Sequence, residues 1–152
     1  LEAAGKIGIP QIITPCGFDM LSCGPLERGE RGDPFWVSKD IKHRKLFIPD
    51  AFRVQARTTA QELKEIAREV ARKLNQSKGP VAVLIPLKGW SSLDQEGMPL
   101  YDPEADQAFV KELKIHLKKT ISLVEVDLHL NTREFAEVVV DQFLSLYKKA
   151  IL

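Results

Sequence analysis

The chain has 152 residues, which suits one domain with its own hydrophobic core and leaves little room for two. Hydrophobic residues make up 44% of it and charged residues 28%, which excludes a disordered segment, and no apolar run is long enough to span a bilayer. Because 22 Lys and Arg oppose 21 Asp and Glu, we expect neither nucleic acid nor membrane as a partner. Two cysteines are too few for a disulfide scaffold, so we expect a cytoplasmic protein.

The first half of the chain predicts two strands, a long excursion and a helix. An apolar run over 10–16 is typical of a buried strand, and the glycine-bearing segment 17–25 predicts a loop after it. Residues 26–50 are rich in glycine, proline and mixed charge, which predicts an excursion with an embedded strand. Residues 52–57 alternate like a strand, and Thr59 with Glu62 forms a capping box for an amphipathic helix that ends near Asn75.

The second half predicts two further strand and helix units. Residues 81–85 are apolar on both faces, which indicates a central parallel strand. Asp102 and Pro103 are the N-cap and first-turn proline expected for a helix that reaches about Lys119. Residues 121–130 predict the last strand, and Asn131 is the expected N-cap of the final helix.

These units predict a single α/β domain over 1–152, with a three-layer, Rossmann-like arrangement of a mostly parallel sheet and helices on both faces. Ligands of such sheets bind outside the carboxyl ends of the strands, where helix amino-termini offer free N–H groups. We therefore expect the functional surface in the polar loops that follow the strands.

Four loops carry the candidate binding residues. They offer backbone donors, hydroxyls, cations and a carboxylate, which suit a phosphate or another anion. Tight turns and plain helix capping explain several of these residues equally well. No Walker loop or dinucleotide fingerprint occurs. The candidates are Gly17, Asp19, Gly24, Arg57, Thr58, Thr59, Lys88, Gly89, Ser91, Ser92 and Asn131.

Asp127 and His129 are the candidate catalytic residues. They alternate at the end of the last predicted strand and should face the same side, where they can move a proton or bind a metal. The alternative is that both bond to neighbouring loops, and we assign no metal site because such a site usually needs three or four protein ligands.

A set of short motifs occurs in an order that resembles a known family. The motifs are GIPQ at 8–11, GFDM at 17–20, RTT at 57–59 before EL, KLN at 73–75 with GPV, LIPLKGWS at 84–91, DP at 102–103 and DLHLN at 127–131. From about Leu1 to Tyr147 the chain resembles the uncharacterised protein family that contains the tomato mosaic virus resistance protein. The resemblance implies nucleotide binding, with ATP and Mg as the expected ligand. It also implies that the chain is the carboxyl half of a two-part module, with the loops 17–24, 57–59, 88–92 and 127–131 as its site.

Three functions remain open at this stage. The first is a module that binds a nucleotide or another anionic small molecule in those loops. The second is an enzyme that uses Asp127 and His129, and the third is an interaction domain whose partner is the missing amino-terminal half or a second copy in a homo-oligomer. For the third, we expect an apolar patch on the surface.

Overall fold

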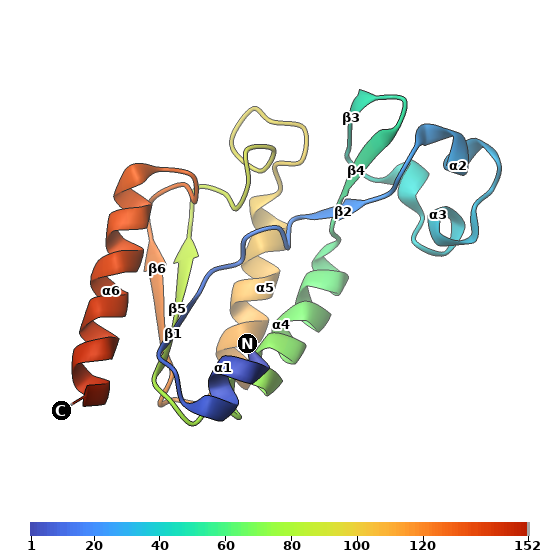
Figure 1. Ribbon diagram of the computed structural model, residues 1–152. Coiled ribbons are helices and arrows are strands. Elements are labelled where there is room, and N and C mark those ends of the chain that lie inside the picture. Colours follow the sequence, from blue (N-terminus) through green and yellow to red (C-terminus); the bar gives the residue numbers. More distant parts are fainter. Residues whose placement is uncertain (152) are drawn as a thin grey trace.

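The computed structural model describes residues 1–151, with side chains described as far as Lys148. Figure 1 shows a layered body from which a smaller lobe projects. The body contains α1 (Glu2–Ile7), β1 (Gln11–Ile13), α4 (Ala60–Leu74), β5 (Val81–Pro86), α5 (Pro103–His116), β6 (Ser122–Val126) and α6 (Arg133–Ile151). The lobe contains β2 (Met20–Ser22), α2 (Leu26–Glu30), α3 (Pro34–Ser38), the 3₁₀ helix η1 (Ile41–His43), β3 (Leu46–Asp50) and β4 (Arg53–Arg57).

The body is built on a parallel sheet with the strand order β1-β5-β6. β5 lies in the centre, and all six of its residues are buried because alternate side chains enter two different cores. Val81, Val83 and Ile85 face α4 and α5, whereas Ala82 and Leu84 face α6. The predicted central strand is confirmed.

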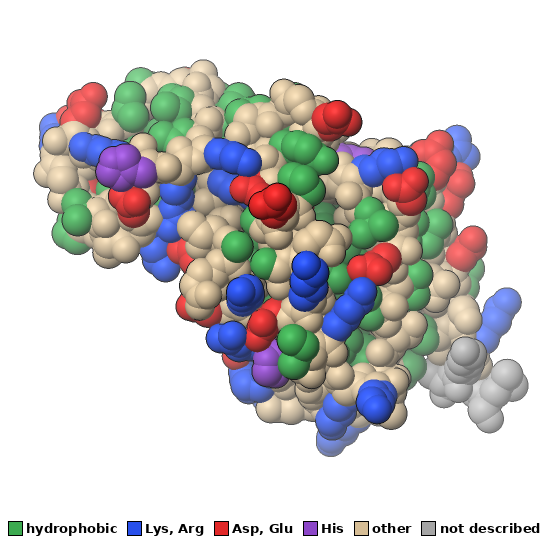
Figure 2. All heavy atoms as spheres, turned by 180° about the vertical axis from the view of Figure 1, so that it is seen from behind, with side chains coloured by type: hydrophobic (Ala, Val, Ile, Leu, Met, Phe, Trp, Pro, Cys, Tyr) green, Lys and Arg blue, Asp and Glu red, His purple; other side chains and the backbone are tan. Residues whose placement is uncertain are grey.

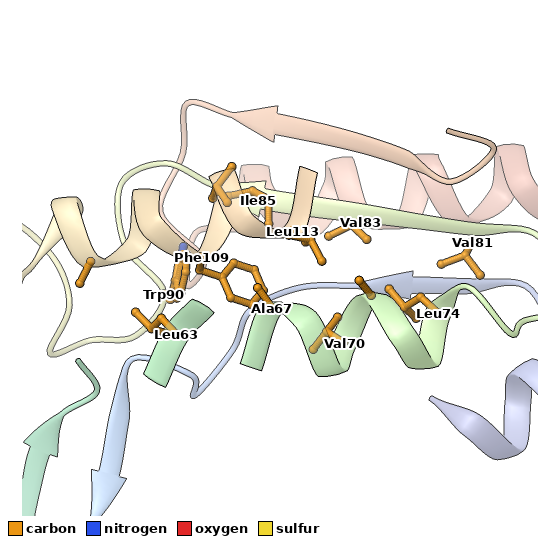
Figure 3. Packing of buried hydrophobic residues seen from close by; sticks show 13 residues of the cluster. Leu63, Ala67, Val70, Leu74, Val81, Val83, Ile85, Trp90, Phe109 and Leu113 are labelled. Atoms are coloured by element: carbon orange, nitrogen blue, oxygen red, sulfur yellow. The ribbon is translucent and has the colours of Figure 1, made fainter. Parts of the chain in front are cut away.

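Helices cover both faces of this sheet. Figure 3 shows side chains of α4 and α5, among them Leu63, Phe109 and Leu113, meeting beneath β5. On the other face Phe135 of α6 closes a smaller core over Ala82 and Leu84. The predicted α/β class with a mostly parallel sheet and helices on both faces is confirmed.

Both predicted helix starts in the middle of the chain are present. The Thr59 hydroxyl accepts a hydrogen bond from the Glu62 N–H (3.2 Å), and the Glu62 carboxylate accepts one from the Thr59 N–H (3.1 Å), which completes the capping box of α4. Asp102 caps α5 by accepting from the Ala105 N–H (3.1 Å). α5 ends at His116, three residues before the predicted end, because Leu117 is already extended.

The lobe corrects two expectations. Residues 17–25 are not one loop, because β2 lies within them, and β4 is not part of the parallel sheet. β2, β4 and β3 form a separate antiparallel sheet with the order β2-β4-β3, which packs around Cys23, Trp36, Ile41, Val54 and Ala56. The alternation in residues 52–57 is typical of an antiparallel strand with one covered face, and it was the available sign of this arrangement.

The last strand is shorter than predicted. β6 ends at Val126, so Asp127 and His129 lie in the turn that follows it and not in the strand. The cap of α6 is Thr132, whose hydroxyl accepts from the Phe135 N–H (3.2 Å), whereas Asn131 is exposed one residue earlier. The predicted strand included Leu128 and Leu130, which alternate with polar residues, but in the structure both lie in this turn.

Candidate anion-binding pocket

A pocket of about 640 Å³ lies between the lobe and the first turns of α4 and α5. Its walls come from segments that are far apart in the sequence, namely residues 39–45 of the lobe, residues 57–60 and residues 102–105. Seen from behind in Figure 2, the lobe extends well beyond the body, and acidic and basic side chains surround a histidine on it. The lining residues are Lys39, Asp40, His43, Arg44, Lys45, Arg57, Thr58, Thr59, Ala60, Asp102, Glu104 and Ala105.

The start of α4 forms one wall. Thr59 and Ala60 line the pocket, and the amides of Ala60 and Gln61 have no acceptor inside the helix because the helix begins there. The first turn of a helix also carries the positive end of its dipole. This wall is therefore suited to a negatively charged group.

Two cations of the lobe stand over the same wall and share one carboxylate. Arg44 donates to Glu62 (2.7 Å), and Lys39 also donates to Glu62 (3.0 Å). Burial acts to raise the pKa of Glu62, but the hydrogen bonds from Arg44, Thr59 and Lys39 outweigh it and lower that pKa to about 2. With Glu62 ionised, one positive charge of this trio is left uncompensated.

The start of α5 forms the opposite wall and is acidic. Asp102 and Glu104 line the pocket there, and Lys45 of the lobe donates to Asp102 (3.1 Å) and to the Tyr101 carbonyl (2.7 Å). Lys45 therefore ties the lobe to the body across the pocket. The acidic wall favours hydroxyl or amine groups of a ligand, because carboxylates accept hydrogen bonds.

A buried arginine forms the floor between the two walls. Arg57 is 4% exposed, and its guanidinium donates to the carboxylate of Asp106, to the Asp102 carbonyl (3.1 Å) and to the Asp19 carbonyl (3.2 Å). Asp94 lies 3.5 Å from the same guanidinium. The carboxyl groups of Asp94 and Asp106 thus flank one buried cation, and the buried carboxyl group of Asp19 is close enough to feel its charge.

This imbalance alters the acidity of the cluster. Burial, aided by the neighbouring Asp94, raises the pKa of Asp106 to about 8 and outweighs the opposing effect of Arg57. Burial also raises the pKa of Asp19, although the Ser91 hydroxyl bond acts against it. Near neutral pH the cluster therefore holds a proton, which reduces the surplus of negative charge around Arg57.

Two polar groups on this floor lack a protein partner. The Thr58 hydroxyl and Nε of Arg57 are buried without a hydrogen bond, although the residues that carry them line the pocket. Thr58 is only 1% exposed. Buried polar atoms are almost always hydrogen-bonded, so the unpaired hydroxyl of a residue that lines a pocket is a candidate ligand contact.

The other predicted loops are linked to this floor through hydrogen bonds. The Ser91 hydroxyl donates to Asp19 (2.6 Å), His129 Nε2 lies 2.9 Å from the Ser91 carbonyl, and the Asn131 N–H bonds to His129 Nδ1 (3.1 Å). Both ring nitrogens of His129 are thus engaged with the backbone, which fits a neutral ring that holds two loops together. Gly89 lies in the same network and has a φ of 117°. The position requires glycine, because a Cβ there would lie 1.6 Å from the Asp94 carbonyl oxygen.

The structure therefore brings part of the predicted site together. Arg57, Thr58 and Thr59 line the pocket, while Asp19, Gly89, Ser91 and Asn131 belong to the adjoining network. Lys88 pairs with Asp127 (3.1 Å) on the surface of the same sheet edge, and Ser92 is exposed. Gly17 and Gly24 flank β2 and line no part of the pocket. Of the four predicted loops, only 57–59 contributes residues to the lining of this pocket.

Sequence reasoning missed the lobe cations and the buried Asp106. Lys39, Arg44 and Lys45 looked like part of a solvated excursion, and only the folded lobe places them over α4 and α5. Asp106 did leave a signal, because it lies on the same helix face as Phe109, Val110 and Leu113, where an unpaired charge is out of place.

Two features of the described residues bear on the function classes. Within residues 1–151, no helix combines the length and the apolar character needed to cross a membrane. The described residues also contain no group of three or more His, Cys, Asp and Glu that could hold a metal ion. Of the two candidate catalytic residues, Asp127 pairs with Lys88 and His129 bonds to the Ser91 carbonyl.

The fold and the pocket define a class of protein, an α/β domain with a polar pocket at the helix starts near its parallel sheet. The match of residues 1–147 to the model of the C-terminal domain of uncharacterised protein family UPF0261 is more specific, and the chain belongs to that family. A UPF0261 protein of Clostridium tetani is 35% identical over 150 residues, which are 98% of this chain and 35% of the relative. A UPF0261 protein of Brucella melitensis is 34% identical over 90% of this chain and 31% of its own length.

The tomato ToMV resistance protein Tm-1(GCR237) is also similar, with 33% identity over 93% of this chain and 18% of its own length. The predicted family resemblance is thus confirmed. The chain spans about a third of the length of the two bacterial relatives and less of the tomato protein.

Proposed function

We propose that this domain binds an anionic small molecule, a phosphate ester of the nucleotide or sugar type, in the pocket at the starts of α4 and α5. The observation that carries the proposal is the buried, unpartnered Thr58 hydroxyl beside the free N–H groups of α4. The uncompensated charge of Lys39 and Arg44 over the same turn supports it.

The two walls favour different parts of such a ligand. A phosphate fits the α4 wall, where N–H groups, the Thr58 hydroxyl and the lobe cations converge. Hydroxyl groups fit the opposite wall, where Asp102 and Glu104 can accept from them. ATP, the ligand that the family resemblance implies, has both kinds of group, and so do simpler nucleotides and sugar phosphates.

Titration calorimetry with ATP, AMP and inorganic phosphate tests the proposal. The Lys39→Ala variant should bind AMP about tenfold more weakly, because one charged hydrogen bond is lost. Lys88→Ala is the matched control, since Lys88 is also an exposed lysine in an ion pair but lies outside the pocket. Absence of binding by all three probes at millimolar concentration contradicts the proposal. An equal effect of Lys88→Ala moves the site to the 88–92 loop.

The predicted loop site and the predicted enzyme remain hypotheses beside this one. Gly17, Asp19, Gly24, Lys88, Gly89, Ser91, Ser92 and Asn131 are proposed as supporting or alternative ligand contacts, which the Lys88 control addresses. Proton transfer by His129 would require it to give up one of its backbone partners, so binding is the function better supported by the geometry.

We also propose that the domain packs against a protein partner, which is the third function that the sequence left open. The support is that the curated relatives are about three times as long as the stretch they share with this chain. The partner is then the other part of such a chain or a second copy.

A further inference from the structure

The body has an apolar surface beside the outer edge of β1. Four side chains of α6 that are 38–55% exposed, Val140, Phe143, Leu144 and Tyr147, follow the spacing i, i+3, i+4, i+7. They lie on the part of the helix surface that is not buried with Phe135. A groove of about 440 Å³ continues this stripe onto β1, where Ile12 and Ile13 line it. We call Ile12, Val140, Phe143, Leu144 and Tyr147 the α6–β1 surface.

β1 also offers an open sheet edge in that surface. Among the described residues it pairs with β5 alone. The Gln11 N–H donates to the Pro80 carbonyl (3.0 Å), and since alternate residues of a parallel strand face the same neighbour, the N–H of Ile12 points away from β5. An unpaired edge beside an apolar groove is a template for another strand.

The handedness of the fold fixes on which side a preceding strand would lie. The crossovers from β1 to β5 and from β5 to β6 place α4 and α5 on one face of the sheet. α1, which leads into β1, packs against α4 on that same face, and Lys73 of α4 lies 3.6 Å from Glu2. Because parallel crossovers are right-handed, a strand joined to β1 through α1 must lie beyond β1, on the side away from β5.

The same rule covers α6. Suppose that successive strands of the chain are added at increasing distance from β1, on the side away from β5. This order runs opposite to β1-β5-β6, so right-handed crossovers place their connecting helices on the opposite face of the sheet, which is the α6 face. Such a helix would meet the exposed stripe of α6. The stacked rings of Phe143 and Tyr147, with centroids 6.2 Å apart, provide a flat apolar contact for it.

We infer that the α6–β1 surface is the docking face for the sequence that precedes this domain in its family, with a parallel strand added beside β1 and an apolar helix face laid on the α6 stripe. The family description, a C-terminal domain, places the additional sequence of the longer relatives on this amino-terminal side. Leu1 lines the groove, so in such relatives the chain enters the domain at this surface. The inference deepens the partner part of the proposed function and is independent of the anion pocket.

Amide hydrogen exchange measured by NMR in this chain and in the full-length Clostridium tetani relative tests the inference. In this chain the Ile12 amide should exchange fast. The matching amide of the relative should exchange at least a hundredfold more slowly, as slowly as amides of the β5 match. The outward amides of β6, the other edge strand, are the internal control. An Ile12 match that stays fast in the relative overturns the inference.

Two further measurements distinguish the preceding sequence from a second copy of the chain as the occupant of the α6–β1 surface. If Ile12 of this chain becomes protected as the concentration rises, a second copy is the occupant and the inference is overturned. Replacement of the relative's match to Leu144 by Glu should lower its Tm by about 5 °C or more, whereas Leu144→Glu should leave the Tm of this chain nearly unchanged. Ile115→Glu, at another exposed apolar residue, is the control in both proteins. Equal losses in the two proteins contradict a docking role, and AMP affinity should be unaffected throughout.

Discussion

Replacement of Thr58 by valine should make the protein more stable and a weaker binder. Valine has nearly the shape of threonine but replaces the hydroxyl by a methyl group, and the Thr58 hydroxyl is buried without a partner. An unsatisfied buried hydroxyl costs roughly 1–3 kcal/mol, so its removal should stabilise the unliganded fold by about 1 kcal/mol. For a domain of this size that is a rise of about 2–4 °C in Tm.

The same change should cost affinity, since the hydroxyl is proposed to bond to the anion. Loss of one hydrogen bond of about 1 kcal/mol corresponds to roughly fivefold weaker binding of AMP. Urea unfolding followed by the fluorescence of the buried Trp36 and Trp90 measures the stability, and calorimetry measures the affinity.

The neighbouring threonine is the matched control. The Thr59 hydroxyl accepts from the Glu62 N–H, so Thr59→Val should lose about 1 kcal/mol of stability through the broken cap. Opposite signs at adjacent threonines are the expected result. If Thr58→Val is destabilised as much as Thr59→Val, the Thr58 hydroxyl has a partner and the reasoning fails.

Three further predictions concern the buried residues around the pocket and the sheet. The pKa of Asp106 is raised to about 8 in the fold from an ordinary 3.8, so its contribution to stability is complete below about pH 4 and is lost as the pH rises toward 8. Asp106→Asn imitates the protonated acid, so its free energy of unfolding relative to that of the wild type should rise by up to about 1.4 kcal/mol per pH unit over that range. Urea unfolding of both proteins at pH 5, 7 and 9 measures this, and a difference that stays constant with pH would contradict it. Leu84→Ala should cost about 2–4 kcal/mol because Leu84 is wholly buried beneath α6, and a loss near zero in the same assay would mean that this core is not formed. Gly89→Ala should cost about 2 kcal/mol or more, since the new methyl meets the Asp94 carbonyl, and a wild-type Tm would show that the loop is looser than described.

The parts of the fold set by neighbouring residues were predictable. β5 was visible because five consecutive apolar residues leave no face for water, and the start of α4 because Thr59 and Glu62 stand three residues apart. The start of α5 followed from Asp102 and Pro103 in the same way. Each of these signals lies within one element.

The lobe and most of the pocket depend on contacts between distant segments. Pairing of β2 with β4 joins Met20 to Arg57, and no local pattern in residues 17–25 specifies that register. Arg57, Thr58 and Thr59 were found from their place at a helix start, whereas Lys39 and Arg44 reach the pocket only because the lobe folds over it. Of the predicted site, the residues tied to a helix start entered the pocket and the exposed Lys88 did not.

The anion is proposed to bind at the first turn of α4. An NMR titration of this chain with AMP addresses it directly, because each backbone amide reports on its own surroundings. The amides of Ala60 and Gln61 should show the largest shifts, those of Lys39 and Arg44 smaller ones, and those of residues 88–92 almost none. Shifts confined to residues 88–92 and Asn131, or no shifts at millimolar AMP, would contradict the account.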